Sequence, residues 1–324
     1  MHRARLGKDL VAEFWPPTRK TKRQRLILLC DGMPSMPRKQ PLAEFLAAKG
    51  YWVFYPRWRG SWESGGQLLA REPQVDLSEL LDALRRPVRE AAFGERFEVR
   101  PEEVFVIGGS FGGTAAILAT LDRRVSKAVA NCPVVDWSIL DREQSKETSN
   151  PSYAAYIREA FGAAYRLSAR DWNKLRNGRF FSPLAHAGEL DRSKILMYHA
   201  QDDPYVPWRT VQDFADRTGI RLRLFRRGGH LSTARTVPRR WAEIQRFFTR
   251  GPAGGPRGPS WPSVSGSLGA AERGPAPVNG EAVEALRAFR VRGSHAGRVR
   301  RPGWGCTRAW GSRRRRKRCP RSFR

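Results

Sequence analysis

Residues 101–122 decide the fold of this chain: Pro101-Glu-Glu-Val-Phe-Val-Ile-Gly-Gly-Ser-Phe-Gly-Gly-Thr-Ala-Ala-Ile-Leu-Ala-Thr-Leu-Asp122. The apolar run Val104 to Ile107 is typical of a strand buried on both faces of a parallel sheet. The Ala- and Leu-rich run Gly113 to Leu121 predicts a helix. Between them, Gly108-Gly-Ser-Phe-Gly112 matches G-x-S-x-G, the strand-to-helix turn that presents a nucleophilic serine at a helix N-terminus. A glycine-rich turn with an incidental serine is the alternative, but the flanking strand and helix favour the nucleophile.

Strand and helix patterns alternate on both sides of this stretch. The alternation predicts an α/β fold over residues 1–250, with a mostly parallel sheet covered by helices on both faces. Leu10 to Phe14 is expected to be a short edge strand that ends at Pro16. The other expected strands are Leu26–Cys30, Tyr51–Tyr55, Val125–Asn131, Lys194–His199 and Ile220–Phe225, and the expected helices are Pro41–Lys49, Val75–Leu84, Val211–Arg217 and Arg239–Thr249.

Residues 133–182 interrupt the alternation. They are rich in aromatic side chains, with helical spacing from Tyr153 to Tyr165. An aromatic insertion between two core strands predicts a small helical lid over a pocket. Simple packing of these aromatics onto the sheet is the alternative for most of them.

Basic residues are distributed unevenly. The chain has 60 Lys and Arg against 31 Asp and Glu, a net charge of +29, and residues 251–324 hold 17 basic and 3 acidic residues. This Gly-, Pro-, Ser- and Arg-rich segment predicts a disordered basic tail, because it cannot bury enough apolar surface to offset the entropy of ordering. The block Arg313–Arg318 could bind nucleic acid or an acidic surface. We favour a read-through or frame-shifted extension instead, so nucleic acid is not an expected partner.

The cysteines and the N-terminus bear on the compartment. Cys30 and Cys132 end apolar strands and are expected to be buried thiols, and the four cysteines form no C-x-x-C pair. This usage suggests a reducing compartment, and we expect a cytoplasmic protein. The charged N-terminus leads into no apolar h-region, and no run approaches the ~20 apolar residues of a membrane span.

A serine nucleophile needs a base, usually a histidine that a carboxylate orients. Of the five histidines, His230 is the best base, because it follows a strand and a Gly-Gly pair at the carboxyl edge of the sheet. His2 and His295 are expected outside the folded core, His199 within or at the end of a strand, and His186 in a loop that could line a pocket. The carboxylate should come from the loop after the preceding strand, which offers Asp202 and Asp203. The order Ser, Asp, His is that of α/β-hydrolases.

An oxyanion hole needs two donors aimed at the developing negative charge. One should be the backbone N–H of Phe111, the residue after the nucleophile. The other should come from the loop after Leu26–Cys30, where Met33 follows Asp31-Gly32 and Pro34 stiffens the turn. A merely tight turn is the alternative. Asp31 is expected to point away from the substrate and to accept hydrogen bonds from backbone N–H groups of the Gly32 to Arg38 loop.

Taken together, these motifs resemble the catalytic domain of the prolyl oligopeptidase (S9) serine peptidases and their dienelactone-hydrolase-like relatives. Gly108-Gly-Ser-Phe-Gly-Gly113 matches the elbow of that family, Arg57-Trp-Arg-Gly-Ser61 resembles its N-Y-R-G-S segment, and Gly229-His230 matches its histidine. Ala200-Gln-Asp-Asp-Pro-Tyr-Val-Pro207 resembles its G-x-x-D-x-x-V-P loop, with Ala in place of Gly. The resemblance therefore assigns the catalytic acid to Asp203 and not to Asp202. Asp31-Gly32 replaces the usual H-G, and no β-propeller is seen, so peptidase specificity is not carried over.

The resemblance implies a serine hydrolase that cleaves ester or peptide bonds through an acyl-enzyme. Ser110, His230 and Asp203 would form the triad, and the amides of Phe111 and Met33 the oxyanion hole. No metal or organic cofactor is implied, and the expected substrates are small esters, thioesters or short peptides. Peptidase and esterase activities are about equally supported. A non-catalytic binding protein on a hydrolase scaffold is the remaining alternative. The sequence does not fix the acyl group, the leaving group or the oligomeric state.

Overall fold

A computed structural model describes residues 1–19, 21–138 and 151–250 of the chain. Residues 251–324, for which the sequence predicts a disordered tail, lie outside this part. Within the described part, no helix is long and apolar enough to cross a membrane.

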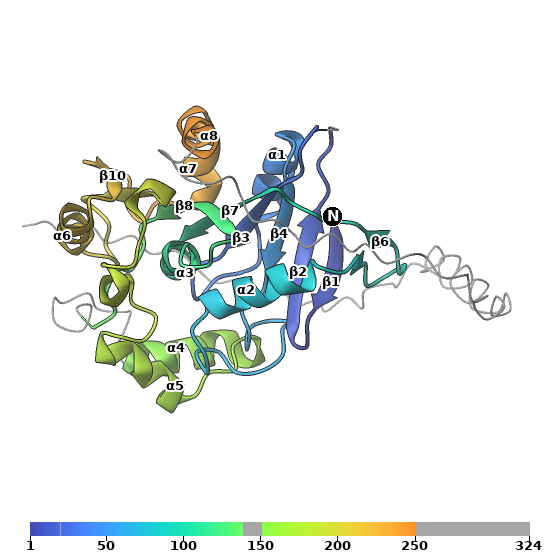
Figure 1. Cartoon of the computed structure of the whole chain (residues 1–324). Helices are drawn as coiled ribbons and strands as arrows, with labels where there is room; N and C mark the ends of the chain where they lie inside the picture. The colour runs from blue at the N-terminus through green and yellow to red at the C-terminus, as the bar shows by residue number, and fades with distance from the viewer. Residues whose placement is uncertain (20, 139–150, 251–324) are drawn as a thin grey trace, which may run out of the picture. The chain divides into compact units, whose positions relative to one another are not determined.

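The centre of the fold is an eight-stranded sheet with the order β1-β2-β4-β3-β7-β8-β9-β10 (Figure 1). The first two pairs of neighbouring strands, β1 with β2 and β2 with β4, are antiparallel. All the other neighbouring pairs of this sheet are parallel. The strands are β1 (His2–Leu6), β2 (Leu10–Trp15), β3 (Arg25–Cys30), β4 (Trp52–Pro56), β7 (Glu103–Gly109), β8 (Val125–Asn131), β9 (Ile195–Ala200) and β10 (Arg221–Phe225). A separate two-stranded ribbon pairs β5 (Val88–Arg89) with β6 (Arg96–Phe97).

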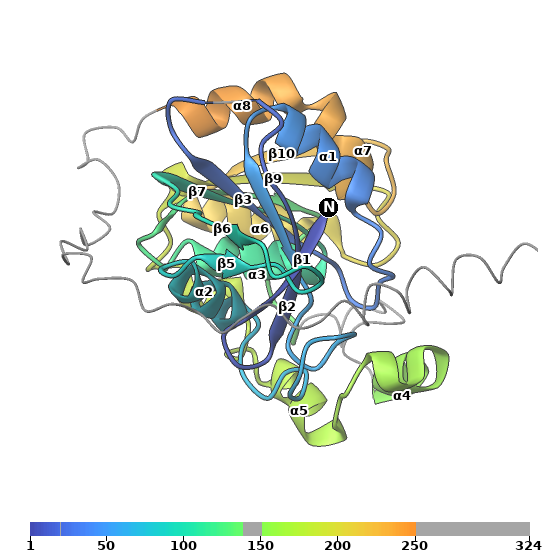
Figure 2. The ribbon, with the colours of Figure 1, turned by 90° about the vertical axis from the view of Figure 1, so that its right-hand side faces the viewer.

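Helices cover both faces of the sheet, as the alternating pattern predicts. Figures 1 and 2 show α1 (Gln40–Ala48), α7 (Thr233–Arg239) and α8 (Trp241–Thr249) on one face. The other face carries α2 (Gln74–Ala83), α3 (Phe111–Ala119) and α6 (Trp208–Thr218). Each face has its own apolar core. Leu46 and Ile244 belong to the first core, and Leu80, Ile117 and Phe214 to the second.

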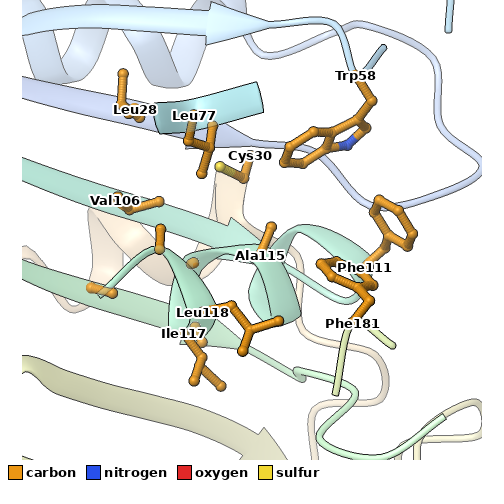
Figure 3. Packing of buried hydrophobic residues seen from close by; sticks show 14 of the residues in the cluster. Leu28, Cys30, Trp58, Leu77, Val106, Phe111, Ala115, Ile117, Leu118 and Phe181 are labelled. Atoms are coloured by element: carbon orange, nitrogen blue, oxygen red, sulfur yellow. The ribbon is translucent and has the colours of Figure 1, made fainter. Parts of the chain in front are cut away.

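The strand β7 occupies the middle of the sheet, between β3 and β8. Its run Val104 to Ile107 is fully buried, as the apolar sequence requires of a central strand. Against one face of it lies α3, whose Ala115, Ile117 and Leu118 are buried in the packing shown in Figure 3. The register pairs Cys30 with Gly108. The ends of β3 and β7 therefore lie at the same edge of the sheet, where their following loops meet.

The N-terminal strands differ from the expectation. The prediction that Leu10–Phe14 forms an edge strand is wrong, because β2 is paired on both sides and β1 forms the edge. The expectation that His2 lies outside the folded core is also wrong: its ring stacks on Phe14 with centroids 5.2 Å apart. The basic sequence of β1, HRARL, has no strand-like apolar pattern, since only Ala4 and Leu6 are buried.

The insertion 133–182 contains α4 (Pro151–Phe161) and α5 (Ala169–Asn173). Short 3-10 turns follow at Gly162–Ala164, Lys174–Asn177, Pro183–His186 and Arg192–Lys194. Residues 139–150 lie outside the described part. The predicted helical character of this insertion is confirmed for the rest. Several of its aromatics pack inward as the alternative had it, including Trp137, Trp172 and Phe181.

Candidate active site

Ser110 sits on the sharp turn between β7 and α3. Its backbone has φ 55° and ψ −122°, a conformation that costs free energy for a residue with a side chain. The turn closes only because its glycines lack a Cβ: a Cβ on Gly108 would lie 1.9 Å from the carbonyl oxygen of Gly112. The strained elbow that G-x-S-x-G predicts is therefore present, and it points the serine into a cavity that Ser110 lines.

Asp203 and His230 form a close pair at the same edge of the sheet. The His230 Nδ1 atom lies 2.8 Å from Asp203 Oδ2, and the Asp203 side chain is fully buried. The amides of Tyr205 and Val206 donate to Asp203 Oδ1 at 2.9 and 3.1 Å. Burial alone would raise the pKa of Asp203, but the hydrogen bond and charge of His230 and the amide of Tyr205 hold it below its usual value. The carboxylate is thus ionised and orients one ring nitrogen of His230.

The neighbouring acid, Asp202, faces the other way and has a different role. Its Oδ1 atom accepts hydrogen bonds from the amides of Gly228 and Gly229, both at 2.8 Å. Asp202 therefore ties the loop after β9 to the glycines that precede His230. The sequence offered both acids, and the geometry pairs Asp203 with the histidine while Asp202 fixes the loop that carries it.

Ser110 and His230 line one cavity of about 770 Å³. No hydrogen bond joins their side chains within the described residues. Aromatic rings of the lid insertion form part of the wall. Among the lining residues are Asp31, Gly32, Met33, Lys39, Tyr153, Tyr156, Phe161, Tyr205, Leu231 and Ser232. The predicted lid over a pocket is present in α4, which supplies Tyr153, Tyr156 and Phe161.

The loop after β3 runs directly beside the serine. A Cβ on Gly32 would be 3.5 Å from Ser110 Cβ, and Met33 lines the cavity. Within the described residues, the amides of Met33 and Phe111 donate to no protein acceptor. Both N–H groups are thus available to an oxygen bound at Ser110.

Asp31 turns out to be held by more partners than expected. Its Oδ1 atom accepts a hydrogen bond from the amide of Gly32 at 3.0 Å. Within the described residues, this is its one hydrogen bond from a backbone N–H of the Gly32 to Arg38 loop. The same Oδ1 atom lies 3.2 Å from Lys39 Nζ. Its Oδ2 atom accepts a short hydrogen bond from the hydroxyl of Tyr55 on β4. Burial, and then the charge of Asp31, raise the pKa of Tyr55, so this hydroxyl remains a donor. Neither contact follows from a local motif, because Lys39 lies beyond the far end of the loop and Tyr55 is on a separate strand.

The lid and the loop after β3 are also joined. The Tyr165 hydroxyl accepts from the amide of Ser35 at 2.9 Å and donates to its carbonyl at 3.2 Å. Trp62 Nε1 donates to the same carbonyl at 3.2 Å. The end of the lid therefore fixes the loop that carries Met33.

Within the described residues, the remaining histidines and cysteines form no second centre. His186 pairs with the exposed Glu189, and His199 is buried with Nε2 3.0 Å from the carbonyl of Val206. Ligand atoms of Cys132, Asp203 and His230 lie within 4.8 Å of one another, a spacing that could hold a metal ion. Burial and the Asp203 charge raise the pKa of the Cys132 thiol, which disfavours the thiolate that a metal requires. Cys132 is instead a buried thiol, as expected, and it accepts a hydrogen bond from the amide of Leu231 at 3.2 Å.

The sheet order and the elbow define the protein as an α/β-hydrolase. More particularly, the chain belongs to the prolyl oligopeptidase family, whose model matches residues 39–251, and it is a serine hydrolase. No curated protein sequence is similar enough to match the chain.

Solved structures share the fold at low sequence identity. The Pyrococcus furiosus esterase PF2001 is 18% identical with a TM-score of 0.51, and the match covers 74% of this chain and 84% of the esterase. The acylaminoacyl peptidase of Pyrococcus horikoshii is 18% identical with a TM-score of 0.54, over 77% of this chain. The chain spans only 41% of that peptidase. These similarities support the fold alone and do not indicate a substrate for this chain.

Proposed function

We propose that this protein hydrolyses ester or amide bonds of small acyl substrates through an acyl-enzyme on Ser110. The observation that carries the proposal is the buried Asp203–His230 pair, 2.8 Å apart, in the cavity that Ser110 also lines. A serine hydroxyl is a weak nucleophile until a base removes its proton. His230 is the one histidine of the described residues that lines this cavity.

The reaction runs in two steps. Ser110 Oγ attacks the carbonyl carbon while His230 Nε2 takes its proton, and the amides of Phe111 and Met33 stabilise the negative oxygen. His230 then gives the proton to the leaving group, whose bond to the acyl carbon breaks. Water attacks the acyl-enzyme with His230 again as base, and the acid and free Ser110 are released. Asp203 keeps its own charge throughout and holds the imidazole in one tautomer.

Labelling with a fluorophosphonate probe tests the nucleophile. The wild-type chain should be labelled, and Ser110→Ala should not. Ser232→Ala is the matched control, because Ser232 lines the same cavity and should leave labelling intact. Turnover on a panel of p-nitrophenyl esters and aminoacyl-arylamides should fall by several orders of magnitude in Ser110→Ala. Equal turnover by wild type and Ser110→Ala would refute the assignment of this site.

A further inference from the structure

The segment that carries His230 is unusually basic. Residues 221–250 contain nine arginines, no lysine and a single acidic residue, Glu243. This segment forms β10, the His230 loop, α7 and α8. A large part of the positive charge of residues 1–250 is therefore gathered on the elements that hold the catalytic base. We call the arginines of residues 221–250 the arginine tract.

Two adjoining cavities are lined by this tract. The larger, of about 420 Å³, has Arg221, Arg223, Arg240, Arg246 and Arg250 in its wall. The smaller, of about 250 Å³, has Arg227, Arg235, Arg239 and Arg240. Both are also lined by Phe225, so the two cavities share Phe225 and Arg240. Concave sites of this size suit a small ligand better than an extended polymer.

The charge in these cavities is mostly uncompensated. Glu243 binds Arg223 Nε at 2.7 Å. Within the described residues, no carboxylate lies within ion-pair distance of the other tract arginines. Arg240 instead lies over the ring of Phe225, 4.8 Å from its centroid. Guanidinium groups present two parallel donors that match phosphate oxygens, so several unpaired arginines in a concave wall form a site for a ligand with several phosphates.

The smaller cavity and the active-site cavity share part of their lining. His230, Leu231 and Ser232 line both this cavity and the one that contains Ser110. The general acid of the reaction must deliver its proton to the leaving atom, so the leaving group departs on the His230 side. A leaving group longer than a few atoms would pass residues 230–232 and reach the arginines.

We propose that the substrate is an ester or thioester whose leaving group carries phosphate groups, and that the arginine tract binds them. This inference rests on the proposed function and specifies its substrate class. The acyl group stays in the cavity of about 770 Å³, and the phosphates occupy the arginine-lined cavities.

Two acetyl thioesters, one with a phosphorylated leaving group and one with a short leaving group free of phosphate, test the inference on the full chain. Acetyl-coenzyme A carries phosphates on its leaving group, and S-acetyl-N-acetylcysteamine does not. The wild type should prefer acetyl-coenzyme A by at least about tenfold in kcat/KM, mainly through a lower KM, since one charge-assisted contact already has this effect. The combined variant Arg227→Gln/Arg235→Gln/Arg239→Gln should lose most of this preference.

A control variant removes the same charge elsewhere. Arg5, Arg86 and Arg123 are exposed, make no ion pair within the described residues and line neither cavity. Arg5→Gln/Arg86→Gln/Arg123→Gln should keep both the preference and the basal rate. Both variants retain residues 251–324, so any attraction of coenzyme A to that basic segment is equal in the two.

The outcomes separate the two proposals. Hydrolysis of both thioesters at similar kcat/KM overturns the inference but leaves the proposed function intact. The inference is also overturned if the control variant loses its preference for acetyl-coenzyme A as much as the tract variant does. It is overturned as well if the tract variant loses affinity for an RNA oligonucleotide while its preference for acetyl-coenzyme A is unchanged. If only p-nitrophenyl esters are turned over, free coenzyme A should inhibit the wild type competitively, and its failure to inhibit refutes the inference. A chain that hydrolyses none of these substrates refutes both proposals.

Discussion

Gly112 offers a sharp test of how the elbow and the loop after β3 are fitted together. It is the second residue of α3, and its α-carbon faces the end of β3. A Cβ placed there would lie 2.4 Å from the carbonyl oxygen of Cys30 and 2.6 Å from that of Asp31. Both contacts are to backbone atoms, which cannot rotate away as the end of a side chain can. Gly112→Ala therefore forces α3 and the loop after β3 apart.

The size of the effect follows from these distances. Carbon and oxygen in ordinary contact are at least 3.4 Å apart, so the loop must move by about 1 Å. Overpacking of this kind costs about 1–3 kcal/mol in the free energy of unfolding. Since 1 kcal/mol shifts the melting temperature of a domain of this size by about 2–4 °C, the variant should still fold. Turnover should fall further, by about 10²-fold, because a displacement of about 1 Å would remove the Met33 amide from the oxyanion that we propose it binds.

The assay compares kcat on one p-nitrophenyl ester with the thermal melting curve. Gly188→Ala is the matched control, because a Cβ on Gly188 would meet nothing within 4 Å. Gly113→Ala should fall between the two, since its nearest contacts would be 3.1 Å from Pro133. Wild-type turnover in Gly112→Ala, or a loss no greater than that in Gly188→Ala, would refute the close fit of elbow and loop.

Four further predictions test the roles assigned above. Asp203→Ala should lower kcat by several orders of magnitude, whereas Asp202→Ala should act mainly by loosening the His230 loop, with a smaller loss of kcat and a lower melting temperature; equal losses in kcat would contradict the division of roles. The pKa of Asp203 is lowered in the fold, so its ionised form contributes stability above about pH 4, and this stability is lost as the pH falls through the folded pKa. Asp203→Asn should therefore weaken the dependence of the melting temperature on pH below pH ~4. Asp31→Asn should keep most of the activity, while Asp31→Ala should lose about 10²–10³ in turnover through a displaced loop; higher turnover in both would make Asp31 a brake. Truncation after Arg250 should leave melting temperature and hydrolysis nearly unchanged, and a large fall in melting temperature would show that residues 251–324 pack on the domain.

The parts of the fold that follow from local pattern could be predicted from the sequence. The buried strands, the elbow and the helices that alternate with them lie within a few residues of their predicted bounds, because apolar runs and glycine positions determine them locally. The edge strand β1 could not be predicted because it lacks such a local pattern. Three of its five residues are polar and only two are buried, so its apolar alternation is too weak to indicate a strand. Its pairing with β2 depends on a short turn at Gly7, which has φ 59°.

The candidate site shows a similar division. Ser110 and His230 are marked by glycine motifs, but the choice between Asp202 and Asp203 came from the family resemblance alone. Spacing could not separate two adjacent acids, because their side chains differ only in the direction that the folded loop gives them. The arginine-lined cavities could not be predicted from the sequence either. The charge of residues 221–250 is visible in the sequence, but the two cavities exist only once β10, α7 and α8 are packed together.

Asp31 shows how a charge unfavourable for catalysis can be kept beside the proposed oxyanion hole. An unpaired carboxylate there would oppose the negative oxygen of the transition state, and two unit charges ~8 Å apart interact by about 2 kcal/mol at an effective dielectric constant of ~20. Lys39 lies 3.2 Å from one carboxylate oxygen and cancels most of this field, since the ion pair carries no net charge. The amide of Gly32 and the hydroxyl of Tyr55 fix the direction of the carboxylate. The same three contacts hold the start of the loop whose next amide belongs to Met33. The carboxylate therefore anchors the start of the loop, and its ion pair with Lys39 makes this anchor compatible with an oxyanion at the proposed site.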